Sequence, residues 1–154
     1  RHGASNQEQF RKLISFVKSN KENYSNIFVL WGITSIYRWE MYSNTTDQIE
    51  PFIWGRRYKN KELQEESTYH FKHFWNKEYE LEKLGGHITA LDAYLTAQDI
   101  DHLFFNSFQS YNNQDLQFDN TNLFYKIKES NNDMLSFLCH KNNIKLSNME
   151  KQII

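Results

Sequence analysis

Cysteine, proline, glycine and long apolar runs are all scarce in this chain of 154 residues. The single cysteine, Cys139, excludes an internal disulfide, and its place in the apolar stretch Met134–Cys139 favours a buried, inert thiol. No apolar run approaches the ~20 residues that a membrane-spanning helix needs. The first residues show no signal-peptide pattern either. We therefore expect no contact with a membrane.

Charge of one sign is also lacking. The chain carries 18 basic and 19 acidic residues, a net charge of -1, with a pI of about 6.7. This balance provides no global basic field, so nucleic acid is not an expected partner. The five glycines form no glycine-rich phosphate loop, which leaves a nucleotide- or phosphate-binding domain as the weakest of the alternatives. No cofactor is expected.

Aromatic residues are plentiful, at 16% of the chain, with twelve Phe, nine Tyr and four Trp. They can fill a core although small aliphatic residues are sparse. Mean hydropathy is -0.80, and the polar excess comes from Asn, Gln, Lys and Glu rather than from Pro and Gly. The length fits one domain, so we expect residues 1–154 to form a single α/β domain.

The stretch from Asn26 to Glu40 is the most informative part of the chain. Its apolar first half predicts a strand at Asn26–Trp31 that is buried on both faces, as in a parallel sheet covered by helices. After Gly32 come the hydroxyls of Thr34 and Ser35 and the charges of Arg38 and Glu40. Loops beyond the carboxyl ends of such strands carry the sites of α/β proteins. The alternative is a strand end followed by a solvated turn.

The elements around this strand predict the fold class. An apolar stripe at helical spacing predicts a helix from Gln7, and a second buried strand is expected at His102–Phe108. Between them, 43–60 reads as an irregular excursion, and Lys61 to about Tyr79 reads as a charged helix. A further helical stripe follows, either through Gly85–Gly86 or after a break there. Alternation of helices and strands favours an α/β domain with a parallel sheet.

Polar residues also follow the second strand. Asn106 and Ser107 stand where the carboxyl end of that strand would meet the end of the first. The turn Gly3–Asn6 opens the first helix, where unpaired backbone N–H groups can stabilise an oxyanion; a simple helix cap is the alternative. Arg38 and Glu40 are expected to pair with each other, the alternative being that Arg38 binds a carboxylate or phosphate.

Other residues are also candidate parts of a site. Trp54 and Tyr58 are expected to anchor the excursion at 43–60, which is long enough to be functional. Glu66, His70 and His73 share one helical face, but they lack the His-Glu-x-x-His spacing, and we expect partly exposed histidines rather than zinc ligands. Asp99 and His102 have the spacing of a hydrolase dyad, yet they lie at the amino end of the second strand, opposite the expected site.

With the segments Gly3-Ala-Ser-Asn6 and Gly32-Ile-Thr-Ser35, the layout resembles that of SGNH (GDSL-type) hydrolases. The resemblance spans about residues 1–110. It implies that Gly3 contributes a backbone N–H to the oxyanion hole and that Thr34 stands where the family has an oxyanion-hole asparagine. The residues expected to bind substrate are Asn6, Ser35, Arg38, Glu40, Trp54, Asn106 and Ser107.

The resemblance also implies a three-layer α/β/α fold of flavodoxin-like type and an ester hydrolase, such as a carbohydrate deacylase. Neither the Gly-Asp-Ser block nor a convincing Asp-x-x-His loop is present, so we expect this chain to be the central part of a longer domain whose nucleophile and base lie outside it. The alternative is a non-catalytic glycan- or surface-binding module on a decayed hydrolase scaffold. The run Thr34-Ser-x-Tyr-Arg-x-Glu40 and the segment Asn106-Ser-Phe108 look like those of uncharacterised marine-phage proteins. This resemblance implies that the protein is located in the cytoplasm of an infected cell or in a virion.

Overall fold

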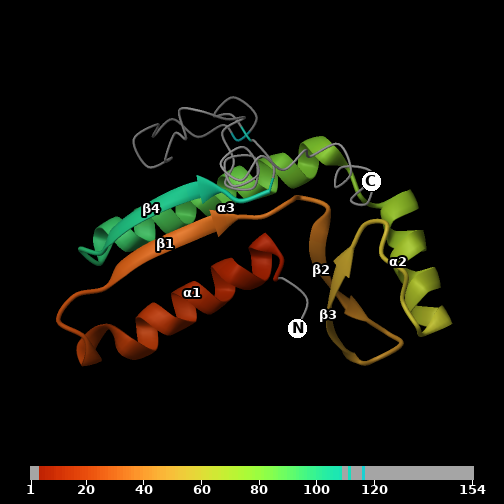
Figure 1. The fold of residues 1–154 in the computed structure, drawn as a ribbon, viewed down its shortest axis with the longest axis horizontal. Helices are drawn as coiled ribbons and strands as arrows, with labels where there is room; N and C mark the ends of the chain where they lie inside the picture. Colours follow the sequence, from red (N-terminus) through yellow and green to blue (C-terminus); the bar gives the residue numbers. More distant parts are fainter. Residues whose placement is uncertain (1–3, 109–110, 112–115, 117–154) are drawn as a thin grey trace, which may run out of the picture.

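The computed structural model of the chain describes residues 4–108, 111 and 116 (Figure 1). This part contains both helices and strands. In chain order they are α1 (Asn6–Asn20), the short helix η1 (Lys21–Asn23), β1 (Phe28–Ile33), β2 (Arg38–Ser43), β3 (Gln48–Ile53), α2 (Lys61–His73), α3 (Lys77–Ala97) and β4 (Asp101–Asn106). The mixed α/β class expected from the sequence is confirmed.

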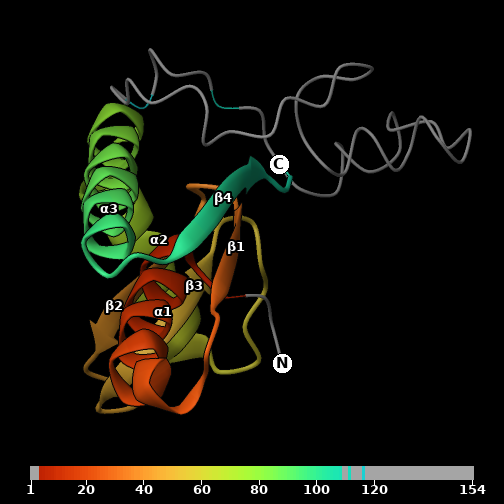
Figure 2. The ribbon, with the colours of Figure 1, turned by 90° about the vertical axis from the view of Figure 1, so that its left-hand side faces the viewer.

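A parallel pair of strands, β1 and β4, forms the centre of the larger part. Val29 pairs with His102 and Trp31 with Phe104, and the last two rings meet edge to face at 5.6 Å. Helices α1 and α3 lie on the same side of this pair (Figure 2). Their apolar stripes close over the inward residues of β1, so Val17 of α1 and the core residues of α3 are buried against the sheet.

The burial of β1 corrects the expectation of a strand covered on both faces. Its residues alternate, with Val29, Trp31 and Ile33 buried, whereas Phe28 and Leu30 on the other face are 64% and 59% exposed. Alternation of this kind is typical of a strand with one covered face. The strand also lies two residues later than predicted, because Gly32 continues the pairing with β4, opposite Phe105.

Residues 43–60 do not form the irregular excursion that the sequence predicted. Most of them belong to an antiparallel hairpin of β2 and β3, in which Trp39 pairs with Phe52. The two rings stack at 6.0 Å, a cross-strand contact that stabilises such a pair. Pro51 is tolerated because β3 pairs only with β2 in the described part of the chain. Asp47, at φ 55°, closes the turn.

Asparagine side chains define the helices that follow the hairpin. Asn60 accepts from the backbone of Leu63 at the start of α2, and Asn76 accepts from Tyr79 at the start of α3. The cap at Asn76 divides the single helix predicted for 61–79 into two. Helix α3 then passes through Gly85–Gly86 without a break.

The hairpin and α2 lie beyond the carboxyl ends of β1 and β4 (Figure 1). None of the helices in the described residues is long and apolar enough to cross a membrane. The expected oxyanion residue Gly3 and the segment around Cys139 lie outside the described residues.

Candidate functional site

The side chain of Asn6 joins the start of α1 to the end of β1. Its Nδ2 donates to the carbonyl oxygen of Thr34 at 2.8 Å, and its Oδ1 accepts from the Thr34 N–H at 2.8 Å. Both residues are buried. One asparagine therefore fixes the amino end of α1 beside the carboxyl end of a parallel strand, the region where α/β proteins form their sites. Its amide is committed to this structural contact.

Tyr111 and Asn106 complete the polar cluster at this edge. The Tyr111 hydroxyl accepts from the Ile36 N–H at 2.8 Å and donates to the Thr34 carbonyl at 3.4 Å. Burial raises the pKa of the Tyr111 phenol, which therefore stays a neutral donor. Asn106 donates from Nδ2 to the Tyr111 carbonyl at 3.1 Å, and the Ser107 N–H donates to the Ile33 carbonyl at 2.9 Å. Ser35 is also buried here.

Two side-chain oxygens in this cluster have no hydrogen-bond partner among the described residues. They are Oγ1 of Thr34 and Oδ1 of Asn106, in residues that are only 2% and 5% exposed. A buried polar atom without a partner costs free energy, so such atoms are rare and need an explanation. The two lie at the carboxyl ends of neighbouring parallel strands, as the sequence led us to expect for Thr34 and Asn106.

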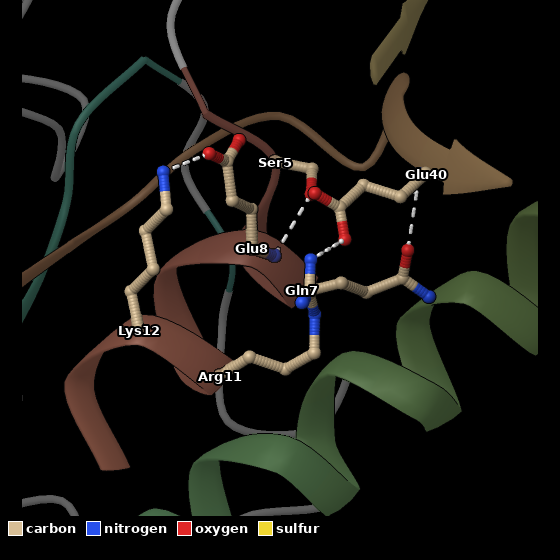
Figure 3. Close-up of polar contacts among 6 residues, drawn as sticks. All are labelled: Ser5, Gln7, Glu8, Arg11, Lys12 and Glu40. Atoms are coloured by element: carbon tan, nitrogen blue, oxygen red, sulfur yellow. Dashed lines mark hydrogen bonds and ion pairs between the residues drawn. The ribbon is translucent and has the colours of Figure 1, made fainter. Parts of the chain in front are cut away.

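Glu40 does not pair with Arg38, and that prediction is wrong. Figure 3 shows why: Glu40 points to α1, where its Oε2 accepts from Arg11 at 2.8 Å, and its backbone N–H donates to Gln7 at 3.1 Å. In the same view Ser5 caps α1 by accepting from the Glu8 N–H at 3.0 Å, and Lys12 pairs with Glu8. Glu40 thus holds the hairpin against α1.

Arg38 has no carboxylate partner among the described residues. Its guanidinium lies over the ring of Phe108, 5.3 Å from the ring centre, and partial burial lowers its pKa. A small hollow beside it is also lined by the first turn of α1, by Lys83 and by His87. Lys83 pairs at 2.7 Å with Glu80, which also lines the hollow. The hollow has a volume of about 10 Å³, room for about one water, and is too small for an anionic group.

Trp54 lies with α2 rather than at the edge formed by β1 and β4. Its ring stacks on Phe71 with centroids 3.4 Å apart, and its backbone N–H donates to the Tyr37 carbonyl at 3.0 Å. It is 37% exposed. The described contacts of Trp54 are thus with Tyr37 and Phe71, and none of them is with Asn6, Thr34 or Asn106.

The histidine candidates have structural partners. Glu66 accepts from the Ser43 hydroxyl at 2.5 Å and from the Asn44 N–H at 3.0 Å, and His70 stacks on Trp39. Within the described residues no group of three or more His, Cys, Asp or Glu side chains could hold a metal ion.

His102 lies near Asp92, not Asp99. Its Nε2 is 2.9 Å from the Asp92 carboxylate and its Nδ1 is 2.8 Å from the Ile100 carbonyl. Both ring nitrogens therefore face protein acceptors at the amino end of β4. The ring of His102 is therefore occupied by contacts with the protein.

Sequence reasoning missed Tyr111 and Gln7. Tyr111 follows β4 in an Asn- and Gln-rich segment with no pattern of its own, and its contacts with Ile36 span 75 residues. Gln7 looked like an ordinary first-turn residue of α1. The chain matches no family model, no curated protein and no solved structure. The likeness to SGNH hydrolases therefore stays a prediction, and function has to be inferred from the geometry at the carboxyl ends of β1 and β4.

Proposed function

We propose that the protein hydrolyses esters in the manner of SGNH hydrolases, with an acylated carbohydrate as substrate. The observation that carries the proposal is the Thr34 hydroxyl, which is buried at the carboxyl end of β1 beside the start of α1 and has no hydrogen-bond partner among the described residues. A hydroxyl in this place can donate to the oxyanion that develops when an acyl carbon is attacked. The positive end of the α1 dipole favours the same negative charge.

The proposal assigns separate roles to the residues of this edge. Thr34 and the Gly3 N–H stabilise the oxyanion, while Arg38 and Ser107 contact the substrate. Thr34 is 2% exposed, so the acyl group reaches its hydroxyl only after the groups that cover it move. The scaffold in this proposal is the three-layer, flavodoxin-like fold, in which Phe28 and Leu30 face a further layer.

The nucleophile and the base are supplied by parts of the domain outside the described residues. In the proposed reaction a serine Oγ attacks the acyl carbon and its proton passes to a histidine. The histidine then returns the proton to the departing alcohol, and water releases the acyl group by the same route.

Thr34→Val tests the proposal, because valine keeps the shape of threonine and removes only the hydroxyl. The matched control is Thr46→Val, which removes another buried, unpartnered hydroxyl from the β2–β3 turn. In the natural full-length protein, turnover of p-nitrophenyl acetate and of acetylated sugars should fall about 10²–10³-fold for Thr34→Val. Both variants should be as stable as the parent or more so.

Equal activity of the two variants would refute the role of Thr34, and a full-length protein without any esterase activity would refute the function. Thermal unfolding of both variants separates a chemical loss from a folding defect.

A non-catalytic glycan-binding or surface-binding module is the second candidate. The commitment of the Asn6 amide to Thr34 and of Tyr111 to the same backbone favours it, because these polar groups already serve the fold. Glycan binding without turnover by the full-length protein would support this alternative. Either function suits a protein of an infected cell or a virion.

A further inference from the structure

Asn106 has a buried hydrogen-bond acceptor to which the proposed reaction assigns no role. The residue is the last of β4 and is 5% exposed. Its Nδ2 donates to the Tyr111 carbonyl at 3.1 Å, whereas its Oδ1 has no partner among the described residues. A buried acceptor of this kind has lost its hydrogen bonds to water without replacing them, which is unfavourable at a purely structural position. Asn106 is therefore a candidate for contact with a ligand.

The Tyr111 carbonyl decides which way the Asn106 amide points. A carbonyl oxygen can only accept, so the nitrogen of the amide has to face it and the amide oxygen has to face elsewhere. The opposite orientation would place two oxygens against each other. The buried atom without a described partner is thus an acceptor, and a ligand that satisfies it has to bring an O–H or N–H donor.

The Thr34 hydroxyl lies at the end of the neighbouring strand. Asn106 pairs with Ile33, the residue before Thr34, and neighbouring strands lie about 4.8 Å apart. Thr34 and Asn106 are 2% and 5% exposed, and each has a side-chain oxygen without a partner among the described residues. A hydroxyl and an amide oxygen thus come from adjacent strand ends, so one small ligand can reach both.

The two groups match different parts of an acylated sugar. In the proposed reaction Thr34 donates to the oxygen of the acyl group, and this contact leaves the Asn106 oxygen without a donor. An acetyl group has no O–H or N–H, so the donor has to come from the alcohol. In a partly acylated carbohydrate the nearest such donor is the hydroxyl on the next ring carbon.

We propose that the site selects esters whose alcohol has a free hydroxyl on the carbon next to the acylated one, and that Asn106 Oδ1 accepts from this hydroxyl. The inference rests on the proposed ester hydrolysis, since it concerns the same substrate. Asn106 binds the alcohol and takes no part in the proton transfers. A fully acylated sugar lacks the donor and leaves the acceptor unpaired, which disfavours its binding. As for Thr34, the substrate reaches Asn106 after the groups that cover it move.

The test compares three acetate esters with the natural full-length protein. 2-Hydroxyethyl acetate has the hydroxyl, propyl acetate has a methyl group in its place, and 2-methoxyethyl acetate has it blocked. The parent protein should have a kcat/KM for 2-hydroxyethyl acetate about tenfold above that for either reference. Equal kcat/KM values for the three esters would overturn the selection and leave the hydrolysis standing. If none of the three is hydrolysed, the selection is overturned, and the proposed hydrolysis falls with it only when p-nitrophenyl acetate is not hydrolysed either.

Two substitutions of Asn106 identify the atom responsible. Asn106→Leu removes the acceptor at similar side-chain size, so the ratio of the kcat/KM values should fall to about one. Asn106→Asp keeps an oxygen for the substrate hydroxyl and should keep most of the preference. Thr34→Val should lower turnover of all three esters without changing the ratio, because the Thr34 hydroxyl contacts the acyl group that they share.

A preference that survives in Asn106→Leu, or that is lost in both Asn106 variants, would overturn the role of Oδ1. The ratio within one variant does not depend on the fraction of folded protein, and thermal unfolding detects a folding defect independently. If Asn106→Leu fails to fold, the comparison of the three esters with the parent still decides whether the selection exists.

Discussion

Two regions of this molecule are built in different ways. The aliphatic region comprises α1, β1, α3 and β4, and its centre is made by Val17, Ile88, Leu91 and Leu95, each 0% exposed. The aromatic region comprises β2, β3 and α2, and ring stacks around Trp39 hold it together. There Phe52, His70 and Phe71 all lie within 6.0 Å of Trp39, centre to centre.

The regions also differ in how far along the chain their contacts reach. The aliphatic region joins α1 and β1 to α3 and β4, and β1 pairs with β4 although β2, β3, α2 and α3 lie between them in the sequence. The aromatic region is continuous from Arg38 to His73, and its ring stacks around Trp39 lie within this segment. Among the described residues, its polar contacts with α1 are those that Glu40 makes with Arg11 and Gln7. It therefore resembles a hairpin and helix inserted into the connection between two parallel strands. We infer that it can open by itself, whereas loss of the aliphatic core unfolds both regions.

Truncation of one core residue in each region tests whether the two regions unfold separately. Leu91→Ala and Phe52→Ala each remove a fully buried side chain and should cost about 3–5 kcal/mol. In native-state hydrogen exchange, Leu91→Ala should lower the protection of every element. Phe52→Ala should lower it in β2, β3 and α2 while β1 and β4 keep theirs. Equal loss in both regions for Phe52→Ala would show that the two unfold as one unit.

The neighbouring glycines Gly85 and Gly86 of α3 test how closely Leu116 packs on the helix in the aliphatic region. A side chain at Gly85 would collide with the carbonyl oxygen of Leu116 and lie 2.9 Å from its carbonyl carbon, whereas one at Gly86 would meet nothing within 4 Å. Gly85→Ala should therefore destabilise the protein by about 1–3 kcal/mol through overpacking. Gly86→Ala should stabilise it by about 0.5–1 kcal/mol, the usual gain within a helix. Urea unfolding of the pair measures both.

The urea experiment includes its own control, since the two substitutions are identical and adjacent. If Gly85→Ala stabilised α3 as much as Gly86→Ala, the close approach of Leu116 to the helix would be contradicted.

The same division explains what the sequence could predict. The stripe of α1 and the apolar runs of β1 and β4 report burial directly, so helix, strands and parallel pairing were foreseen within about two residues. The hairpin was missed because Arg38 to Ser43 mixes polar and apolar residues and because Pro51 argues against a strand. The hairpin is stabilised by the packing of Trp39 on α2, a contact that no local sequence pattern predicts.

The site was predictable only in outline. That polar residues gather at the ends of β1 and β4 follows from parallel pairing, and Thr34 and Asn106 do lie there. The partners of these groups were not foreseen, because Asn6 reaches Thr34 over 28 residues and Glu40 pairs with Arg11 over 29. Single-sequence reasoning has no means to choose among such distant partners.

Each region contains a histidine that stacks on an aromatic ring. His70 lies 5.7 Å from Trp39 in the aromatic region, and His87 lies 4.7 Å from Phe10 in the aliphatic region. Burial lowers the pKa of both below the ordinary value of about 6.5. Lys83 lowers the pKa of His87 further against a smaller opposing effect of Glu80, whereas at His70 the opposing effect of Glu80 exceeds that of Lys83.

A lowered pKa means that the unfolded chain takes up protons more readily than the folded one. The contribution of both histidines to stability is therefore complete above about pH 6.5 and is lost as the pH falls through the lowered pKa values.

The unfolding temperature should decline between pH 7.5 and 5.5. This decline should be smaller than the changes caused by the core truncations or by the glycine substitutions. His70→Phe and His87→Phe keep a ring for stacking and should each flatten this decline. His73→Gln, at the end of α2, reports what loss of an exposed histidine does, because the His73 ring is tilted against that of Tyr69 at 4.5 Å and is not stacked in the core. Hydrogen exchange followed against pH shows which elements lose protection as the histidines take up protons. If His70→Phe reduced this loss in β2, β3 and α2 alone, the aromatic region would titrate as a unit of its own. A change spread over β1 and β4 as well would join the two regions.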